Sequence, residues 1–86
     1  MADVLDPKTK ELVGVAAAVA GHCQPCFEYH FKVALSSGAT VEEIQAAVEL
    51  ARAVRSAGDR HMDEFAMRRM SGAVSDVARE GSGNVG

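Results

Sequence analysis

The sequence predicts an all-α domain, and three features of the chain support this fold class. Apolar residues recur at helical spacing along most of the 86 residues. Residues that favour helix ends separate these apolar segments from one another. No segment alternates apolar and polar residues as a half-buried strand does, and no internal repeat is visible. We therefore expect a small helical domain of about four helices.

The first predicted helix begins after Asp6, a favourable N-cap residue. Pro7 follows it and suits the first helical position, where its missing N–H leaves no bond unmade. The helix continues through "ELVGVAAAVA" and ends near Gly21. Because this segment is apolar on nearly every side, we expect the helix to be buried.

The second predicted helix begins around Gln24. Pro25 cannot lie inside a helix but is tolerated in its first turn. The helix then continues through "CFEYHFKVALSS" to Gly38, which suits a C-terminal cap. This start places Cys26 in the first turn, with His30 one turn later on the same side.

Two further helices are predicted in the second half of the chain. The segment "TVEE", from Thr40 to Glu43, matches a capping box that opens the third helix, and Gly58 is expected to end it. A fourth helix is expected from about Asp59 to Arg79. We expect residues 1–80 to form one helical domain and residues 81–86 to be a flexible tail.

Composition narrows the classes of function. The net charge is −3 and the basic residues form no cluster, which disfavours a nucleic-acid or anionic-membrane partner. The longest apolar run, "VAAAVA", is too short to span a bilayer, and no leader pattern opens the chain. We therefore expect a cytoplasmic protein, where free thiols stay reduced unless chemistry oxidises them.

The segment "GHCQPCFEYHF" contains both cysteines of the chain and carries most of its functional information. Cys23 and Cys26 are three residues apart, and His30 follows four residues later. A thioredoxin-like site requires a preceding βαβ unit, and haem attachment requires a histidine directly after the second cysteine, so both are disfavoured. Zinc stays open as an alternative, because these three residues with His22 or His61 provide four ligands. Two small buried side chains are a further alternative.

The residue types and their spacing suit thiol redox chemistry. A helix N-terminus and a nearby base both favour the thiolate, which is the nucleophilic form of cysteine. Cys26 has both neighbours, with His30 placed to accept its proton. Cys23 is close enough to condense with a sulfenic acid on Cys26 and so form a disulfide. Such a site also needs a carboxylate that orients the histidine.

The stretch "ELVGVAAAVAGHCQPCFEYH" resembles the signature of the AhpD-like alkylhydroperoxidases of the carboxymuconolactone decarboxylase superfamily. The signature has a Glu twelve residues before a Cys-x-x-Cys motif and a His four residues after it, which Glu11, Cys23, Cys26 and His30 match. The segment "ALSSGATVEEIQAAVELARAVRSAG" is also similar to the family, so the resemblance covers about residues 5 to 58.

The resemblance implies a role for each matching residue. Cys26 attacks a hydroperoxide, Cys23 resolves the product, and Glu11 and His30 move protons. By residue type alone, a glutamate in an apolar helix is expected at the surface. Only its spacing from the cysteines therefore indicates that Glu11 is a site residue. The sequence departs from the peroxidase pattern at Pro25, where those members have a further relay histidine. The decarboxylase branch needs no cysteine pair.

The expected function is therefore a thiol-dependent peroxidase that needs no bound cofactor or metal. Its expected partners are a small hydroperoxide and a dithiol reductant protein of the lipoyl or thioredoxin type. The resemblance also implies a homo-oligomer, a hexamer built as a trimer of dimers or a trimer, which the small apolar chain favours. A redox sensor or assembly module without significant turnover is the alternative from another class, beside the zinc-binding domain.

Overall fold

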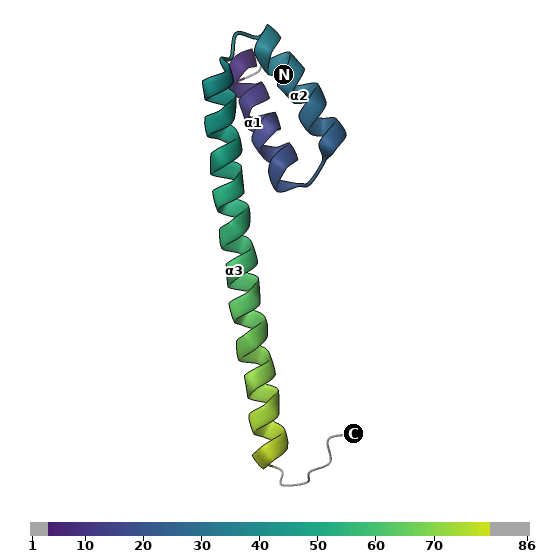
Figure 1. Ribbon diagram of the computed structural model, residues 1–86, viewed down its shortest axis with the longest axis vertical. Helices are drawn as coiled ribbons and strands as arrows, with labels where there is room; N and C mark the ends of the chain where they lie inside the picture. Colours follow the sequence, from purple (N-terminus) through teal and green to yellow (C-terminus); the bar gives the residue numbers. More distant parts are fainter. Residues whose placement is uncertain (1–3, 80–86) are drawn as a thin grey trace. The chain divides into compact units, whose positions relative to one another are not determined.

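The protein is all-α, as the sequence predicts. The computed structural model describes the backbone of residues 4–79 and the side chains of residues 4–74, so the predicted tail at 81–86 lies outside the described residues. Three helices follow one another: α1 (Pro7–Ala20), α2 (Gln24–Ser36) and α3 (Val41–Arg79) (Figure 1). Residues 4–79 contain no strand. The chain divides into two compact units, an N-terminal unit up to Ser56 and a C-terminal unit from Ala57.

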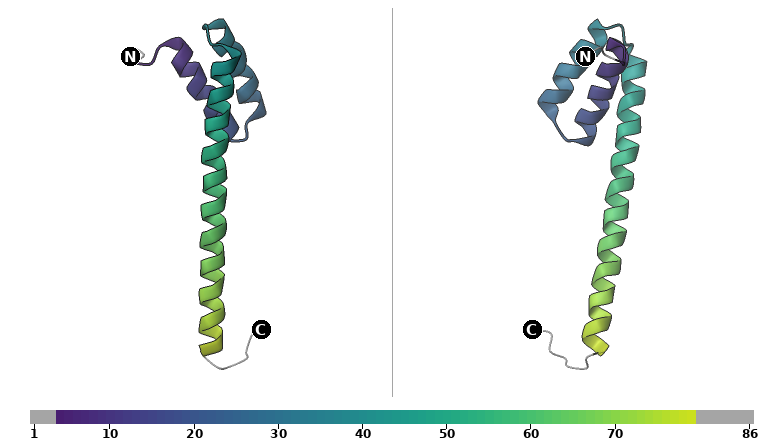
Figure 2. Two further views of the ribbon diagram at one scale, coloured as in Figure 1. Left: turned by 60° about the vertical axis from the view of Figure 1, so that its left-hand side comes forward. Right: turned by 180° about the vertical axis from the view of Figure 1, so that it is seen from behind.

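Local capping residues set the ends of α1 and α2. Asp6 caps α1, and its Oδ1 accepts the Thr9 N–H at 2.8 Å. Cys23 caps α2, and Gly38 adopts a positive φ of 97° just after that helix ends. The two helices lie side by side and antiparallel, joined by a short turn (Figures 1 and 2). The predicted bounds of both helices are confirmed within two residues.

The predicted capping box opens α3. The Thr40 N–H donates to Glu43 Oε1 at 2.9 Å, and the Glu43 N–H donates to Thr40 Oγ1 at 3.0 Å. Lys8 Nζ also donates to Glu43 Oε2 at 3.1 Å, which connects α1 with the start of α3. The Glu43 carboxylate therefore accepts two hydrogen bonds, one from the Thr40 N–H and one from Lys8 Nζ.

The predicted helix end at Gly58 is wrong. A single helix, α3, continues through this position to Arg79, so residues 4–79 contain three helices in place of the expected four. A glycine inside a helix costs only about 1 kcal/mol relative to alanine, and no proline follows to stop the helix. Good helix formers on both sides offset that cost. None of the described helices combines the length and apolarity needed to cross a membrane.

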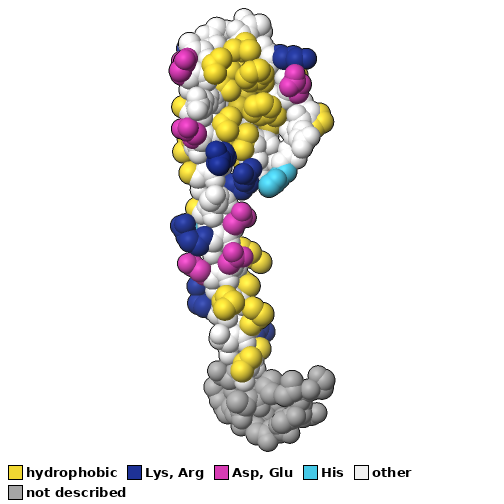
Figure 3. All heavy atoms as spheres, in the orientation of Figure 1, with side chains coloured by type: hydrophobic (Ala, Val, Ile, Leu, Met, Phe, Trp, Pro, Cys, Tyr) yellow, Lys and Arg dark blue, Asp and Glu magenta, His cyan; other side chains and the backbone are white. Residues whose placement is uncertain are grey.

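The hydrophobic core of the N-terminal unit is small. Its central cluster consists of the buried residues Val15, Ala34, Ala39 and Ile44, with Leu12, Phe27, Phe31 and Val48 packed around them. These residues come from α1, α2, the loop before α3, and the first turns of α3. The expected burial of α1 is only partly correct, because Val13 on its other face is 54% exposed. Figure 3 shows hydrophobic side chains gathered on one face of this unit.

The carboxylates of Asp6 and Glu43, at the starts of α1 and α3, predict that the fold loses stability in acid. The Thr9 backbone N–H lowers the pKa of Asp6, and the Thr40 backbone N–H and Lys8 lower that of Glu43. A carboxylate with a lowered folded-state pKa stabilises the fold above its unfolded-state pKa, and the contribution disappears as the pH falls through the folded-state pKa. We expect this loss below about pH 4.5, the higher of the two ordinary values.

Urea unfolding followed by circular dichroism at pH 7, 5 and 3 tests this expectation. The variant D6N with E43Q keeps hydrogen-bond acceptors at both caps but titrates at neither. Its stability should therefore fall less between pH 5 and pH 3 than that of the wild type. Equal losses in the two proteins would contradict the assignment.

Candidate redox site

The turn between α1 and α2 places the cysteine pair. The Gly21 N–H donates to Ala17 O at 2.8 Å, and the Cys23 N–H donates to Ala18 O at 2.9 Å, which closes the end of α1. Between them, His22 adopts a positive φ of 57°, a conformation that histidine tolerates better than most residues. The chain therefore reverses direction directly before the N-cap of α2.

Cys23 and Cys26 form a disulfide across the first turn of α2. Their Cα atoms are 5.2 Å apart. Cys23 Sγ also accepts the Cys26 backbone N–H at 3.2 Å, so a sulfur occupies the position of an N-cap oxygen. Cys26 is exposed, whereas Cys23 is partly buried. The structure thus joins the two cysteines at a helix N-terminus, where the peptide dipoles favour a thiolate on reduction.

Glu11 and His30 form the second pair of the site. Glu11 is only 8% exposed, although it is a carboxylate in an apolar helix. Its Oε1 lies 2.6 Å from His30 Nδ1, which satisfies the buried carboxylate. An ionised carboxylate can only accept, so Nδ1 carries the proton of this bond and Nε2 of a neutral ring is left as the acceptor. A base oriented in this way is suited to take a proton from a thiol.

Gly14 makes room for the histidine, a role that the sequence alone did not reveal. A Cβ built on Gly14 would lie 2.6 Å from His30 Nδ1 and 2.7 Å from Cγ, closer than atoms can approach. The α1 backbone therefore supports the imidazole ring directly at this position. A signal was present, because Gly14 is three residues after Glu11 on the same face of a helix in which glycine is unfavourable.

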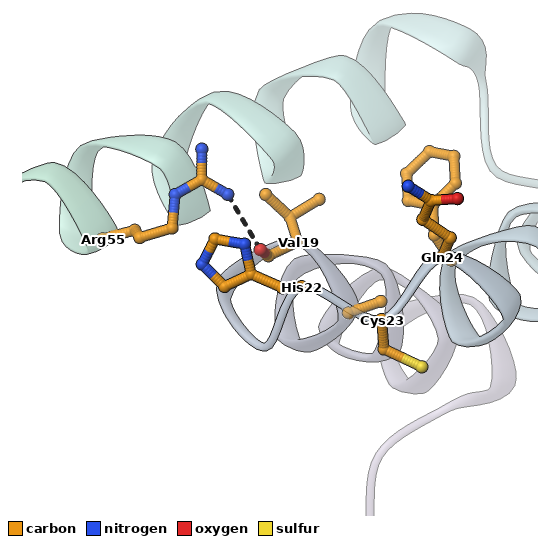
Figure 4. A pocket seen from close by; sticks show the side chains of 7 residues that line it. Val19, His22, Cys23, Gln24 and Arg55 are labelled. Carbon is orange, nitrogen blue, oxygen red and sulfur yellow. Dashed lines mark hydrogen bonds between the residues drawn. The ribbon is translucent and has the colours of Figure 1, made fainter.

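A pocket of about 300 Å³ opens beside Cys23 in the N-terminal unit (Figure 4). It is lined by Ala18, Val19, His22, Cys23, Gln24, Phe27 and Arg55. Arg55 Nη1 donates to Val19 O at 2.9 Å, which connects α3 to the last turn of α1. Arg55 was not among the predicted site residues, and no local pattern marks it, because its partner is 36 residues away in the chain.

The predicted site residues thus occupy one helical hairpin as two bonded pairs. Glu11 contacts His30, and Cys23 is bonded to Cys26. Cys26 and His30 are four residues apart in α2, which places them on the same side of that helix. Within the described residues, no three His, Cys, Asp or Glu side chains are grouped to hold a metal ion. His61, considered above as a zinc ligand, belongs to the C-terminal unit.

Comparisons with known proteins identify the family of the chain. The chain is 42% identical over 52 residues to "Uncharacterized protein 4 in cox locus" of Paracoccus denitrificans, an alignment that covers 60% of this chain. It spans 47% of that relative, about half of its length. No solved structure matches the chain. The model of the carboxymuconolactone decarboxylase family matches residues 1–68. That match includes the whole of α1 and α2, and the chain belongs to the carboxymuconolactone decarboxylase family.

Proposed function

We propose that the protein is a thiol-dependent peroxidase that reduces hydroperoxides through Cys23 and Cys26. The observation that carries the proposal is the hydrogen bond between Glu11 and His30, on the hairpin that also holds the cysteine pair. A buried carboxylate that orients an imidazole one helical turn from a cysteine is a general-base arrangement. Core packing alone does not require a carboxylate at this position, because burial of an ionised group is unfavourable.

The proposed reaction has two steps on the protein. The Cys26 thiolate attacks the outer oxygen of the hydroperoxide, the O–O bond breaks, and the alcohol leaves with a proton, which gives a sulfenic acid. The Cys23 thiolate then attacks the Cys26 sulfur, water leaves, and the disulfide forms. The hydroperoxide is reduced by two electrons and the dithiol is oxidised by two. The proposed half-cycle ends with a disulfide between Cys23 and Cys26, whose Cα atoms are 5.2 Å apart in the structure.

His30 and Glu11 supply the proton transfers of the first step. His30 Nε2 accepts the thiol proton of Cys26 and afterwards donates a proton to the departing alkoxide. Glu11 holds Nδ1 and stabilises the charged ring while it carries that proton. Attack is favoured at Cys26 because it is exposed and lies in the first turn of α2, near the positive end of the helix.

The absence of a histidine at position 25 is compatible with this scheme. Pro25 lies in the first turn of α2, where its missing N–H leaves no hydrogen bond unmade. His22 lines the same pocket as Cys23 and thereby brings a second imidazole beside the pair. A dithiol reductant protein of the lipoyl or thioredoxin type completes the cycle, and we place the enzyme in the cytoplasm, where protein thiols are kept reduced.

The order of attack can be tested with single cysteine variants. Reduced C23S should consume one equivalent of hydroperoxide and retain a sulfenic acid on Cys26, because the resolving thiol is missing. Reduced C26S should consume hydroperoxide at least about a hundredfold more slowly, because the activated thiolate is missing. Stopped-flow kinetics and mass spectrometry of dimedone adducts measure both results.

The same experiment separates the proposal from its alternatives. A sulfenic acid found on Cys23 alone would reverse the two cysteine roles. A wild-type protein that forms its disulfide with hydroperoxide but fails to turn over with any supplied dithiol would instead be a redox sensor. Turnover of a lactone by the C26S variant would indicate the decarboxylase chemistry of the family name.

We also propose that the active form is a homo-oligomer, a hexamer or a trimer. Large hydrophobic side chains are more than half exposed in both units, which is unusual for a chain that remains monomeric. In the C-terminal unit these side chains are Met62, Phe65, Met67, Met70 and Val74. In the N-terminal unit they include Val13, Leu50 and Val54. The core described above is also small for 86 residues.

Light scattering coupled to gel filtration at micromolar concentration should therefore give a mass at least three times the 9.0 kDa of the chain. The variant M67E with M70E places charges on the exposed face of the C-terminal unit and should lower that mass. A helical wild-type protein that elutes as a 9.0 kDa species would contradict this proposal.

A further inference from the structure

We propose that the C-terminal part of α3 pairs with the same segment of a second copy of the chain, antiparallel and around a two-fold axis at Ala66. The surface that makes this contact, which we call the pairing face, consists of Met62, Asp63, Ala66, Arg69 and Met70. The inference rests on the homo-oligomer proposed above and identifies one contact between its subunits. The residues of this face have no part in the peroxide chemistry.

The C-terminal unit needs a packing partner. Its described residues, 57–79, form a single stretch of helix, so they offer no second element to pack on. Helices in water owe most of their stability to the packing of an apolar face. Here Met62, Phe65, Met67, Met70 and Val74 are each more than half exposed, and Figure 3 shows hydrophobic side chains exposed along this part of α3. Such a surface is typical of a contact between chains.

The pairing face has a symmetric sequence. In the segment "MDEFAMRRM", residues 62–70, its members are at i, i+1, i+4, i+7 and i+8, the spacing of one side of a helix. They read Met, Asp, Ala, Arg, Met along the chain, and Met, Arg, Ala, Asp, Met against it. The apolar residues are therefore symmetric about Ala66, while the charge on one side of it is opposite to the charge on the other.

Antiparallel pairing turns this symmetry into complementary contacts. When two copies meet at Ala66, Met62 of one helix is level with Met70 of the other, and Asp63 is level with Arg69. A two-fold contact is reciprocal, so each of these pairs occurs twice. The small side chain of Ala66 lets the two helices approach closely at the centre. Parallel pairing would instead bring Asp63 beside Asp63 and Arg69 beside Arg69, and like charges in contact are unfavourable.

A two-fold contact also distinguishes between the two proposed assemblies. Each such contact joins two chains, so an assembly in which every chain uses it contains an even number of chains. The pairing face therefore favours the hexamer over the trimer.

Cysteine cross-linking of the full chain tests the position of the contact. The protein is kept oxidised, so that Cys23 and Cys26 stay bonded to each other. The two copies of residue 66 adjoin at the axis, so A66C should form an interchain disulfide at least about tenfold faster than E64C. Glu64 is the matched control, because it is exposed and lies two residues earlier on the opposite side of the helix.

Mixtures of two variants test the orientation of the helices. Residue 62 lies four residues before Ala66, so its two copies in an antiparallel pair are about 12 Å apart along the helix axis, too far for a disulfide. M62C should therefore not cross-link with itself, but it should cross-link with M70C when the two proteins are mixed. A parallel pair gives the reverse result.

A charge exchange tests the complementarity. D63R and R69D each bring like charges together across the contact, so each should lower the mass measured by light scattering. The double variant, D63R with R69D, restores opposite charges and should recover the wild-type mass. Added salt should also weaken the wild-type contact, because it screens exposed charges.

Equal cross-linking of A66C and E64C would overturn the proposal, as would M62C that cross-links with itself faster than with M70C. A double charge variant with no higher mass than the single variants would also overturn it. A wild-type mass of three chains or more without cross-linking of A66C rejects this contact and retains the proposed oligomer, whereas a monomeric wild type rejects both. None of these measurements depends on hydroperoxide reduction, so the peroxidase assignment is tested separately.

Discussion

Replacing Glu11 by glutamine is expected to slow hydroperoxide reduction by the reduced protein about a hundredfold, the lower end of the usual range for general acid–base catalysis. Glutamine has nearly the same shape, and its carbonyl oxygen can still accept the bond from His30 Nδ1. It cannot stabilise a positively charged imidazole as a carboxylate does. The proton transfer from Cys26 to His30 therefore becomes less favourable, while the fold stays intact.

Stopped-flow oxidation followed over a range of pH is the appropriate measurement. The variant should lose rate mainly near neutral pH and recover as the pH rises, because hydroxide removes the thiol proton without help. E42Q is the matched control, since Glu42 is an exposed glutamate at the start of α3 and should leave the rate unchanged. A rate for E11Q within twofold of the wild type would remove Glu11 from the proton relay.

Alanine at position 14 is expected to have a second large effect, on both stability and activity. The new methyl group would lie within 3 Å of three ring atoms of His30, so the ring must move away from α1, the helix that also carries Glu11. Overpacking of this kind costs roughly 1–3 kcal/mol, and it outweighs the gain of up to about 1 kcal/mol from removing a helical glycine. Once its bond to Glu11 is broken, His30 no longer serves as an oriented base.

Gly58 offers a matched control for this substitution within the same protein. It also lies inside a helix, but nothing is within 4 Å of the place where a Cβ would be. G58A should therefore stabilise the protein by about 0.5–1 kcal/mol and leave the reaction rate unchanged. Urea unfolding and hydroperoxide kinetics of the two variants give the comparison. Stabilisation by G14A with full activity would contradict the close contact between Gly14 and His30.

The sequence predicted the starts of α1, α2 and α3 correctly, whereas the helix boundary predicted at Gly58 is wrong. Asp6, Pro7, Pro25 and the capping box at Thr40 act through neighbouring residues, so their effects can be read directly from a short stretch of sequence. The prediction at Gly58 is wrong because one glycine weakens a helix by less than the residues on both sides of it strengthen it. Whether a helix stops there depends on a balance of small terms that a single residue does not reveal.

For the candidate site, sequence spacing identified residues but not their surroundings. The resemblance named Glu11, whereas residue type alone placed it at the surface, and the structure places it in the interior against His30. Gly14 and Arg55 were missed for different reasons. Gly14 acts by leaving space, so only its place three residues after Glu11 in a helix could have marked it. Arg55 acts through a contact between distant parts of the chain.

The short hairpin that carries both pairs also has a consequence for the order of folding. Glu11 and His30 are separated by 19 residues and the cysteines by three, so little loop-closure entropy is lost when they meet. The bond between Arg55 and Val19 spans 36 residues and forms only when α3 packs against α1. We therefore expect the cysteine pair and the Glu11–His30 pair to form earlier in folding than the pocket that borders Cys23.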